Sequence, residues 1–189
     1  MPSDSEKETE WIRQIAGGDR AAFEDLYRTY QTRIYRYLFR MLSCRETAEE
    51  TTNDVLVEVW KSARNFRAQS KPSTWIFGIA HHKALNALRR KPAHTVDLEN
   101  AGQVRDPRVD PEARSIRADQ TETLQRALGK LSEPHREVIQ MAFYEGFSCM
   151  EIAEIAGCPV STVKTRMFYA RKELGQLLQR GESGGGKPA

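Results

Sequence analysis

Apolar residues recur with the period of an α-helix along most of this chain, and this pattern restricts the fold more than any other feature of the sequence. The longest run belongs to a helix that begins after Asp19, a residue type that caps helix N-termini well. Its apolar face comprises Phe23, Leu26, Tyr27, Tyr30, Ile34, Leu38 and Met41. No segment alternates apolar and polar residues as a half-buried strand does. The sequence therefore predicts an all-α protein.

Two groups of predicted helices are separated by a polar stretch with several prolines and few large apolar residues. In the first group, Ser43 and Glu46 have the spacing of a capping box that starts a second helix, and Pro72 suits the first turn of a third. The polar stretch cannot bury enough apolar surface to offset the entropy lost on ordering, so it is predicted to be a flexible linker. We expect a first helical domain at residues 1–91, a linker at 92–115, a second helical domain at 116–180 and a disordered tail at 181–189.

Composition excludes several classes of protein. The net charge is only +3, so a nucleic-acid surface has to come from local clusters of cations. The acidic start of the chain does not resemble a secretory signal, and no apolar run approaches the roughly 20 residues that span a membrane. The three cysteines form no C-x-x-C pair, which argues against a disulfide framework or a zinc site. We expect a cytoplasmic protein that is not inserted in a membrane.

Sequence motifs of enzymes are missing as well. The chain has no nucleophile elbow, no phosphate-binding loop and no set of His and Cys residues at metal-ligand spacing. His81 and His82 are adjacent, but neighbouring side chains on a helix diverge by about 100°, so they do not converge on one metal ion. We expect no catalytic residue, no metal and no cofactor.

The strongest local motif is a helix-turn-helix. This motif needs a small residue on the first helix, a residue tolerant of positive φ in the turn, and an apolar residue that faces back from the second helix. Ala153, Gly157 and Val163 satisfy these three needs at the required spacing. Ser148 and Glu151 add a capping box that opens the first helix.

The second helix of this motif is basic. Between Val160 and Lys172 it carries four cations and no acid, as does a recognition helix that enters the major groove of DNA. The alternative interpretation is an ordinary helical hairpin with a solvated basic face.

Both halves of the chain resemble one protein family. The stretches LSEPHREV from Leu131, FYEGFS from Phe143 and TVKTRMFYARKEL from Thr162 resemble region 4 of the extracytoplasmic-function sigma factors. The stretches DRAAFEDLY from Asp19, EVW from Glu58 and WIFGIA from Trp75 resemble region 2 of the same group. The resemblance implies a protein that binds core RNA polymerase and promoter DNA. Its second domain would read the minus-35 element as duplex, and its first would capture the minus-10 element as a single strand.

The resemblance and the residue chemistry together select candidate DNA contacts, because unstacked bases need aromatic partners and the backbone needs cations. The expected minus-35 contacts are Ser161, Thr162, Lys164, Thr165, Arg166 and Arg171. The expected minus-10 contacts are Arg67, Ser70, Lys71, Trp75, His82, Arg89 and Arg90. Two alternatives stay open: Trp75 as a core aromatic, and the terminal arginines as a solvated helix end favoured by the helix dipole.

The third helix departs from the family pattern. The family often carries Arg-Asn where this chain has His81 and His82, and Asp where it has Asn86. The usual Asn takes part in strand opening, so the captured base need not be the usual one.

The helix after Ser43 corresponds to the one that docks on polymerase in the family. The expected docking residues are Glu49, Glu50, Asp54, Glu58 and Trp60. Thr47 stands in place of an acid, and Thr51 and Thr52 in place of apolar residues. We hypothesise that phosphorylation of Thr51 or Thr52 restores the missing negative charge, so that a Ser/Thr kinase, as an alternative to an anti-sigma factor, controls the protein. In the other interpretation these threonines are tolerated surface residues.

Three other functions agree less well with the sequence. A DNA-binding regulator that never joins polymerase would have the same helix-turn-helix, but the first half of the chain resembles no ligand-sensing domain. An enzyme would need a catalytic motif. A pure interaction module leaves the basic recognition helix unexplained.

Overall fold

We describe the protein from a computed structural model, in which residues 4–90, 123–124 and 126–183 are described. The helices are α1 (Asp4–Ala16), α2 (Arg20–Leu42), α3 (Arg45–Ser62), the 3-10 helix η1 (Ala63–Asn65), α4 (Pro72–Arg90), α6 (Glu133–Phe143), α7 (Cys149–Ala156) and α8 (Val160–Ser183). A further helical segment at residues 126–130 precedes α6. The described residues contain no strand, and the all-α prediction is confirmed.

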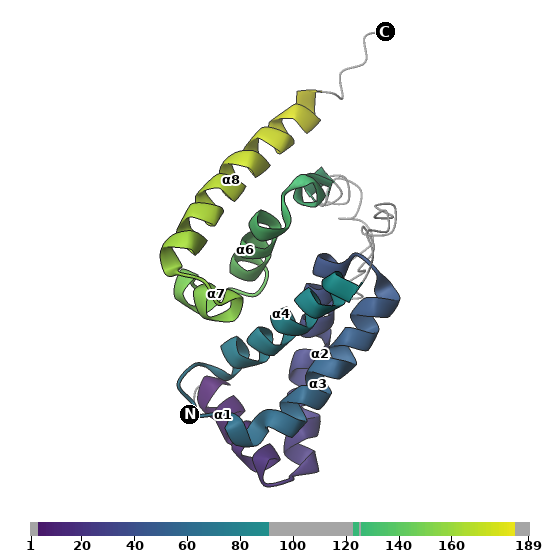
Figure 1. Cartoon of the computed structure of the whole chain (residues 1–189), viewed down its shortest axis with the longest axis vertical. Coiled ribbons are helices and arrows are strands. Elements are labelled where there is room, and N and C mark those ends of the chain that lie inside the picture. Colours follow the sequence, from purple (N-terminus) through teal and green to yellow (C-terminus); the bar gives the residue numbers. More distant parts are fainter. Residues whose placement is uncertain (1–3, 91–122, 125, 184–189) are drawn as a thin grey trace, which may run out of the picture.

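Helices α1 to α4 form an N-terminal bundle (Figure 1). Its core contains fully buried aromatic and aliphatic side chains, among them Tyr30, Ile34, Leu38, Val55 and Phe77. The predicted cap of α2 is confirmed, because Asp19 Oδ1 accepts hydrogen bonds from the backbone N–H groups of Ala21 at 2.8 Å and Ala22 at 3.2 Å.

One prediction for this bundle is wrong, and one of its helices was not predicted. Ser43 does not cap α3: it ends α2 in the left-handed region at φ 51°, and the N-cap of α3 is Cys44, which makes no capping hydrogen bond through its side chain. The sequence interpretation also overlooked α1, which buries Ile12 and Ile15 against the bundle. A helix with so few apolar residues in an acidic segment resembles a polar tail until its packing partners are known.

Helices α6 to α8 form a C-terminal bundle. The predicted capping box on α7 is confirmed, with Ser148 Oγ accepting from the Glu151 N–H and the Glu151 carboxylate accepting from the Ser148 N–H. Gly157 ends α7 at φ 61°, a conformation that other residues adopt at a cost. Helix α8 continues to Ser183, so the tail prediction is wrong for its first residues. The predicted linker and the rest of the predicted tail lie outside the described residues.

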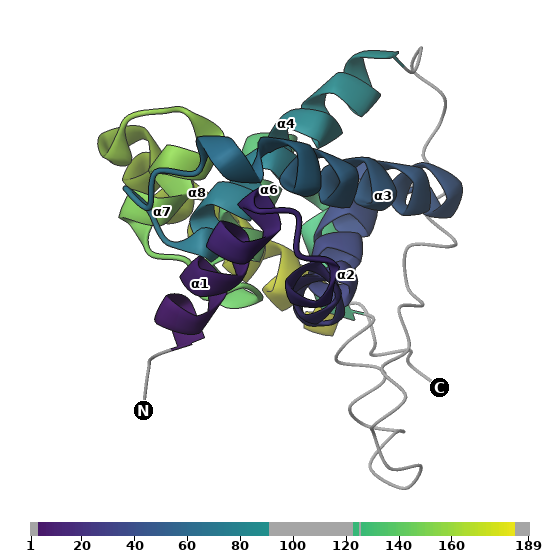
Figure 2. The ribbon, with the colours of Figure 1, turned by 90° about the horizontal axis from the view of Figure 1, so that it is seen from below.

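The two bundles pack directly against each other. Helix α7 contacts α4, and α6 contacts α2. Figures 1 and 2 both place α4 between the other helices of its own bundle and the C-terminal bundle. The rings of Phe77 on α4 and Phe147, which precedes α7, meet edge to face with centroids 5.1 Å apart. Buried residues of both bundles therefore form one continuous apolar cluster.

Candidate nucleic-acid and polymerase interface

The helix-turn-helix formed by α7 and α8 has the packing that its sequence predicts. Ala153 and Val163 are buried where the two helices meet. On the opposite side of α8, Ser161, Lys164 and Thr165 are exposed. The hydroxyl of Thr165 donates to the Ser161 carbonyl at 2.9 Å, which leaves its oxygen as an acceptor for an outside donor. The first turns of α8 thus present short polar side chains and a cation, as direct reading of base edges requires.

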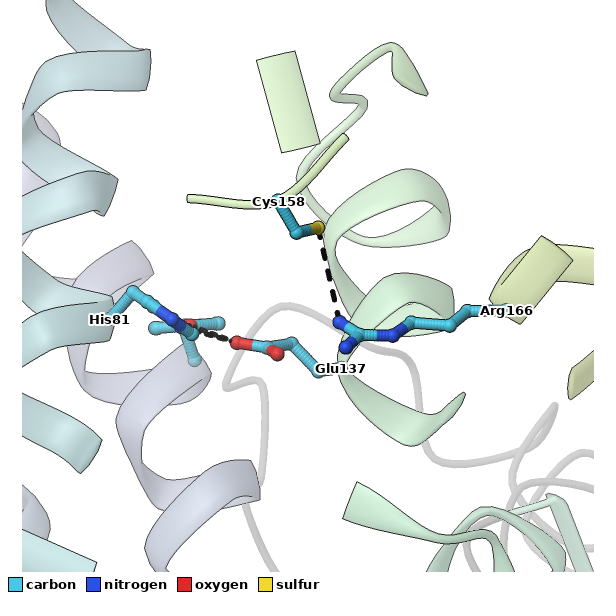
Figure 3. Close-up of polar contacts among 5 residues, drawn as sticks. His81, Glu137, Cys158 and Arg166 are labelled. Carbon is cyan, nitrogen blue, oxygen red and sulfur yellow. Dashed lines mark hydrogen bonds and ion pairs between the residues drawn. The ribbon is translucent and has the colours of Figure 1, made fainter. Parts of the chain in front are cut away.

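The two arginines predicted for this face each have a contact within the protein. Arg166 is half-buried, and its Nη1 is 4.0 Å from Cys158 Sγ (Figure 3). Its side chain also lines a cavity of about 220 Å³ between the bundles. The guanidinium of Arg171 lies over the ring of Phe143, 5.4 Å from its centroid. Arg166 is thus partly withdrawn from the exposed row that begins at Ser161, whereas Arg171 stays exposed and remains a predicted contact.

The predicted minus-10 residues form two groups at the ends of α4. Before and in its first turns lie exposed Arg67, half-buried Ser70, exposed Lys71 and half-buried Trp75. At its far end Arg89 and Arg90 are exposed. Both interpretations of Trp75 receive support, since its ring packs on Phe66 with centroids 5.0 Å apart while part of it stays accessible.

His82 and Asn86 lie on one face of α4, one helical turn apart. The Asn86 side-chain nitrogen is 3.3 Å from His82 Nδ1. Asn86 can donate to the imidazole, which leaves the other ring nitrogen of exposed His82 facing solvent. An exposed imidazole held in this way can read a base by hydrogen bonding.

Lys71 already has a partner in this structure. Its Nζ is 2.9 Å from Glu151 Oε1, the same carboxylate that completes the capping box of α7. Burial by itself would raise the pKa of Glu151, but hydrogen bonds from Lys71 and from the Ser148 backbone and hydroxyl outweigh it, so this pKa lies below its ordinary value.

The lowered pKa of Glu151 predicts a loss of stability in acid. The charged Glu151 carboxylate is more stable in the folded state than in the unfolded state, so it adds to the free energy of unfolding. This stabilisation is complete above the unfolded pKa of about 4.3 and disappears as the pH falls through the folded pKa. We expect the wild type to lose its stability advantage over Glu151→Gln in this acidic window. Urea unfolding of both proteins over the same pH series measures the difference, and a difference independent of pH would contradict the prediction.

Helix α3 has one exposed, largely acidic stripe. Glu49, Glu50 and Asp54 are exposed, as predicted for a surface that docks on another protein. The sequence interpretation missed Val57, which is 49% exposed on the same stripe. The spacing of Glu50, Asp54 and Val57 identifies this shared face, because residues three and four apart lie side by side on a helix.

The other two docking candidates are partly engaged within the bundle. Glu58 is half-buried and pairs with Lys83 of α4 at 3.3 Å. The Trp60 ring packs edge to face on Phe23 of α2, with centroids 5.2 Å apart. Both residues therefore connect α3 to its own bundle in addition to any outside contact.

The structure contradicts the placement of Thr51 and Thr52 on the docking face. Their side chains are 6% and 2% exposed, and the Thr52 hydroxyl donates to the Ala48 carbonyl at 2.7 Å. They lie on the buried face of α3 together with Val55 and Val59. A kinase needs an accessible hydroxyl, so neither threonine is a phosphorylation site in this fold.

The described residues hold no cluster of three or more His, Cys, Asp or Glu side chains that could bind a metal ion. None of the helices described is both long and apolar enough to span a membrane.

Known proteins match both bundles. Residues 26–93 match the family described as Sigma-70 region 2, and residues 121–174 match Sigma-70, region 4. The chain is 37% identical over 157 residues to RNA polymerase sigma factor YlaC of Bacillus subtilis (strain 168), covering 82% of this chain and 91% of YlaC. It is 31% identical over 177 residues to ECF RNA polymerase sigma factor SigW of the same organism, covering 89% and 95% of the two chains.

A solved structure has a similar fold. It is that of the sigma factor RpoE in complex with the anti-sigma factor NepR from Bartonella quintana, which superposes with a TM-score of 0.64 at 22% identity. The match covers 83% of this chain and 96% of the RpoE chain.

Proposed function

Because this chain belongs to the extracytoplasmic-function sigma factors of the sigma-70 family, we propose that it binds core RNA polymerase and directs it to promoters through two separate DNA contacts. The observation that carries the proposal is the combination, in one chain, of a helix-turn-helix with an exposed polar and basic face and a helix with an exposed acidic stripe. The first suits duplex DNA, and the second suits a basic protein surface.

In this proposal the N-terminal bundle binds both the minus-10 element and core polymerase. Exposed Arg67, Arg89 and Arg90 and accessible Trp75 on and before α4 offer backbone cations and a stacking surface. Glu49, Glu50 and Asp54 on α3 offer the docking charges. The C-terminal bundle is assigned the minus-35 element, with Ser161, Thr162, Lys164 and Thr165 nearest the bases.

Run-off transcription tests the function as a whole. Core polymerase, genomic DNA fragments and this protein should give discrete transcripts that core polymerase alone does not give. A pull-down with core polymerase separates the proposal from its main rival, a DNA-binding regulator that does not join polymerase. A chain that binds the promoter DNA but never retains polymerase would favour the rival.

Lys164→Ala should weaken binding to the promoters recovered in that experiment. A cation in a recognition helix that contacts a base edge contributes about 1–3 kcal/mol, so we expect a loss of affinity of about 5- to 150-fold. Lys130→Ala is the matched control, because Lys130 is also exposed in the C-terminal part of the chain but lies outside the helix-turn-helix. Fluorescence anisotropy at one fixed salt concentration compares them, and equal losses would remove Lys164 from the recognition face.

For the regulatory partner we propose an anti-sigma factor rather than a kinase. Thr51 and Thr52 are buried, so there is no longer a reason to expect control by a kinase. The cavity between the bundles is lined by Leu85, Leu88 and Pro134 among others, and it offers apolar surface to a segment of a partner protein. The similar RpoE was solved with an anti-sigma factor. Co-purification of the tagged chain from its own cells, followed by sequencing of retained proteins, tests this partner, and recovery of a kinase with a phosphorylated chain would contradict it.

A further inference from the structure

Helix α1 lies beside both ends of the loop that joins η1 to α4, residues 66–71. We call this segment the minus-10 loop, because it carries the predicted minus-10 contacts Arg67, Ser70 and Lys71. Helix α1 packs against η1 on one side of the loop and against α4 on the other (Figures 1 and 2). It carries no predicted DNA contact itself, yet it touches the elements on both sides of the segment that does.

A chain of hydrogen bonds joins α1 to the start of α4. The hydroxyl of buried Tyr30, on α2, donates to Glu8 Oε2 on α1 at 2.8 Å. The same hydroxyl is hydrogen-bonded to Ser73, the second residue of α4. Because the one hydroxyl proton goes to Glu8, Ser73 donates to the Tyr30 oxygen. Burial of the ring, and then the Glu8 carboxylate, raise the pKa of Tyr30 far above its ordinary value, so the linking proton is retained.

Arg64 makes a second link to α1, on the other side of the loop. Its Nε donates at 3.0 Å to the carbonyl of Ala16, the last residue of α1. The last carbonyls of a helix have no partner within the helix, and a cation there also suits the helix dipole. Arg64 lies two residues before the minus-10 loop and Ser73 two residues after it. Helix α1 is thus tied to both ends of the loop.

The minus-10 loop has a backbone conformation that a free chain rarely adopts. Ala68 has a φ of 53°, in the left-handed region that a β-carbon disfavours. Such a conformation persists only where the surrounding structure enforces it, and it is common at binding sites. The Phe66 ring at the start of the loop packs on Trp75 just after its end, and the Trp75 N–H donates to the Lys71 carbonyl at 3.1 Å. The two ends of the loop are therefore fixed relative to each other.

A loop that is already ordered binds more tightly than one that has to be ordered on binding. Arg67 is exposed and Trp75 is accessible, so a strand could meet a cation and a stacking surface together. It can do so only while the loop keeps these side chains at a constant separation. Tyr30 is buried and Glu8 is an anion, so neither is suited to touch a phosphate backbone itself.

We propose that α1 preorganises the minus-10 loop for single-stranded DNA, with Glu8, Tyr30 and Arg64 as positioning residues. Glu8 and Tyr30 act through Ser73 on the end of the loop that leads into α4, and Arg64 acts on the end that leaves η1. The proposal rests on the function proposed above, because it is the single-stranded minus-10 element that the loop would bind.

Glu8→Ala and Tyr30→Phe each break the chain of hydrogen bonds, whereas Glu8→Gln keeps an oxygen that accepts from the Tyr30 hydroxyl. Each full-length variant is assembled with core polymerase and bound to a labelled single-stranded oligonucleotide carrying the minus-10 element of a promoter recovered by run-off transcription. We expect Glu8→Ala and Tyr30→Phe to bind it about fivefold more weakly than the wild type, which is within the effect of one typical hydrogen bond. Glu8→Gln should restore binding to within about twofold of the wild type.

Glu10→Ala is the matched control, because it removes the same charge from the same helix. Glu10 contacts Arg13 and Gln14 of α1 itself, so its loss should leave the affinity for the oligonucleotide unchanged. All variants should retain the wild-type affinity for core polymerase. Circular dichroism confirms that each is folded.

Hydrogen exchange followed by mass spectrometry measures the loop directly. In Glu8→Ala the amides of residues 66–75 should exchange faster than in the wild type, including those of Phe66 and Trp75, which are hydrogen-bonded in the structure. The amides of α6 to α8 should keep their rates, because the broken link lies in the other bundle.

The outcomes separate positioning from general stability. The proposal is overturned if Glu8→Ala and Glu10→Ala bind the oligonucleotide equally well, or if the affinities for oligonucleotide and core polymerase fall together. Weaker binding with unchanged exchange at residues 66–75 would also overturn it, because the effect would not pass through the loop. A wild-type complex with polymerase that did not bind the oligonucleotide at all would overturn the function proposed above, and with it this proposal.

Discussion

Replacing Thr52 with glutamate should destabilise the N-terminal bundle by about 3–5 kcal/mol, instead of imitating an activating phosphate. The side chain is 2% exposed, and its hydroxyl is engaged by the Ala48 carbonyl. A carboxylate at this position would lose its hydration among Val55, Val59 and other apolar side chains, without any cation on this face of α3 to compensate. Urea unfolding followed by the helical circular dichroism signal measures the loss.

Asn53→Glu is the matched control for this experiment. Asn53 is the next residue on α3 and is exposed, so the substitution adds the same charge at the helix surface. Its effect should stay within about 0.5 kcal/mol, as is usual for surface substitutions. If Thr52→Glu kept the unfolding midpoint of the wild type, Thr52 would be accessible in solution and the kinase hypothesis would regain its basis.

Phe77→Ala should cost about 3–5 kcal/mol, the usual range for removing a buried phenyl ring from a packed core. The ring is completely buried and meets two others edge to face: Tyr37 of its own bundle at 5.4 Å between centroids, and Phe147 of the other bundle at 5.1 Å. Its loss leaves a cavity where the bundles meet, so we also expect the bundles to separate more readily. Urea unfolding reports the first effect, and the radius of gyration reports the second.

Phe143→Ala is the comparison variant, because this ring is 63% exposed and its contact is the guanidinium of Arg171. An exposed cation–π contact contributes about 0.5–1 kcal/mol, so the loss should be several times smaller than that of Phe77→Ala. Equal losses in the free energy of unfolding for the two variants would show that the burial of the Phe77 ring does not stabilise the fold as the structure indicates.

Features that depend on a few neighbouring residues were predicted well. The cap at Asp19, the first turn at Pro72 and the capping box at Ser148 require only that the chain be helical just beyond them. The helix-turn-helix is local in the same sense, because Gly157 sets the turn and Ala153 lies one turn before it. Ser43 shows the limit of such reasoning, because capping boxes and helix ends use similar residues. In the structure Ser43 ends α2 and does not cap α3.

The candidate sites were predicted less completely. The exposed acidic stripe of α3 follows from helical spacing, but the threonines were placed on its surface although Thr51, Thr52, Val55 and Val59 repeat at the spacing of a buried face. That spacing shows that a helix has two faces, whereas only the position of α2 and α4 decides which face is inside. Arg166 was assigned to DNA because it is a cation on the right helix, yet its side chain lies against the cavity between the bundles.

The sequence by itself determined that this chain is helical, where most of its helices begin, and that one pair of them forms a helix-turn-helix. These properties arise from hydrogen bonds and side-chain contacts within about four residues, which sequence spacing encodes directly. Only the tertiary structure decided that Glu137 and Glu145 are buried partners of Tyr37, His81, Arg33 and Arg40 and not surface charges. Those partners are far apart along the chain, and their pairing depends on how two bundles fit together, which no local pattern records.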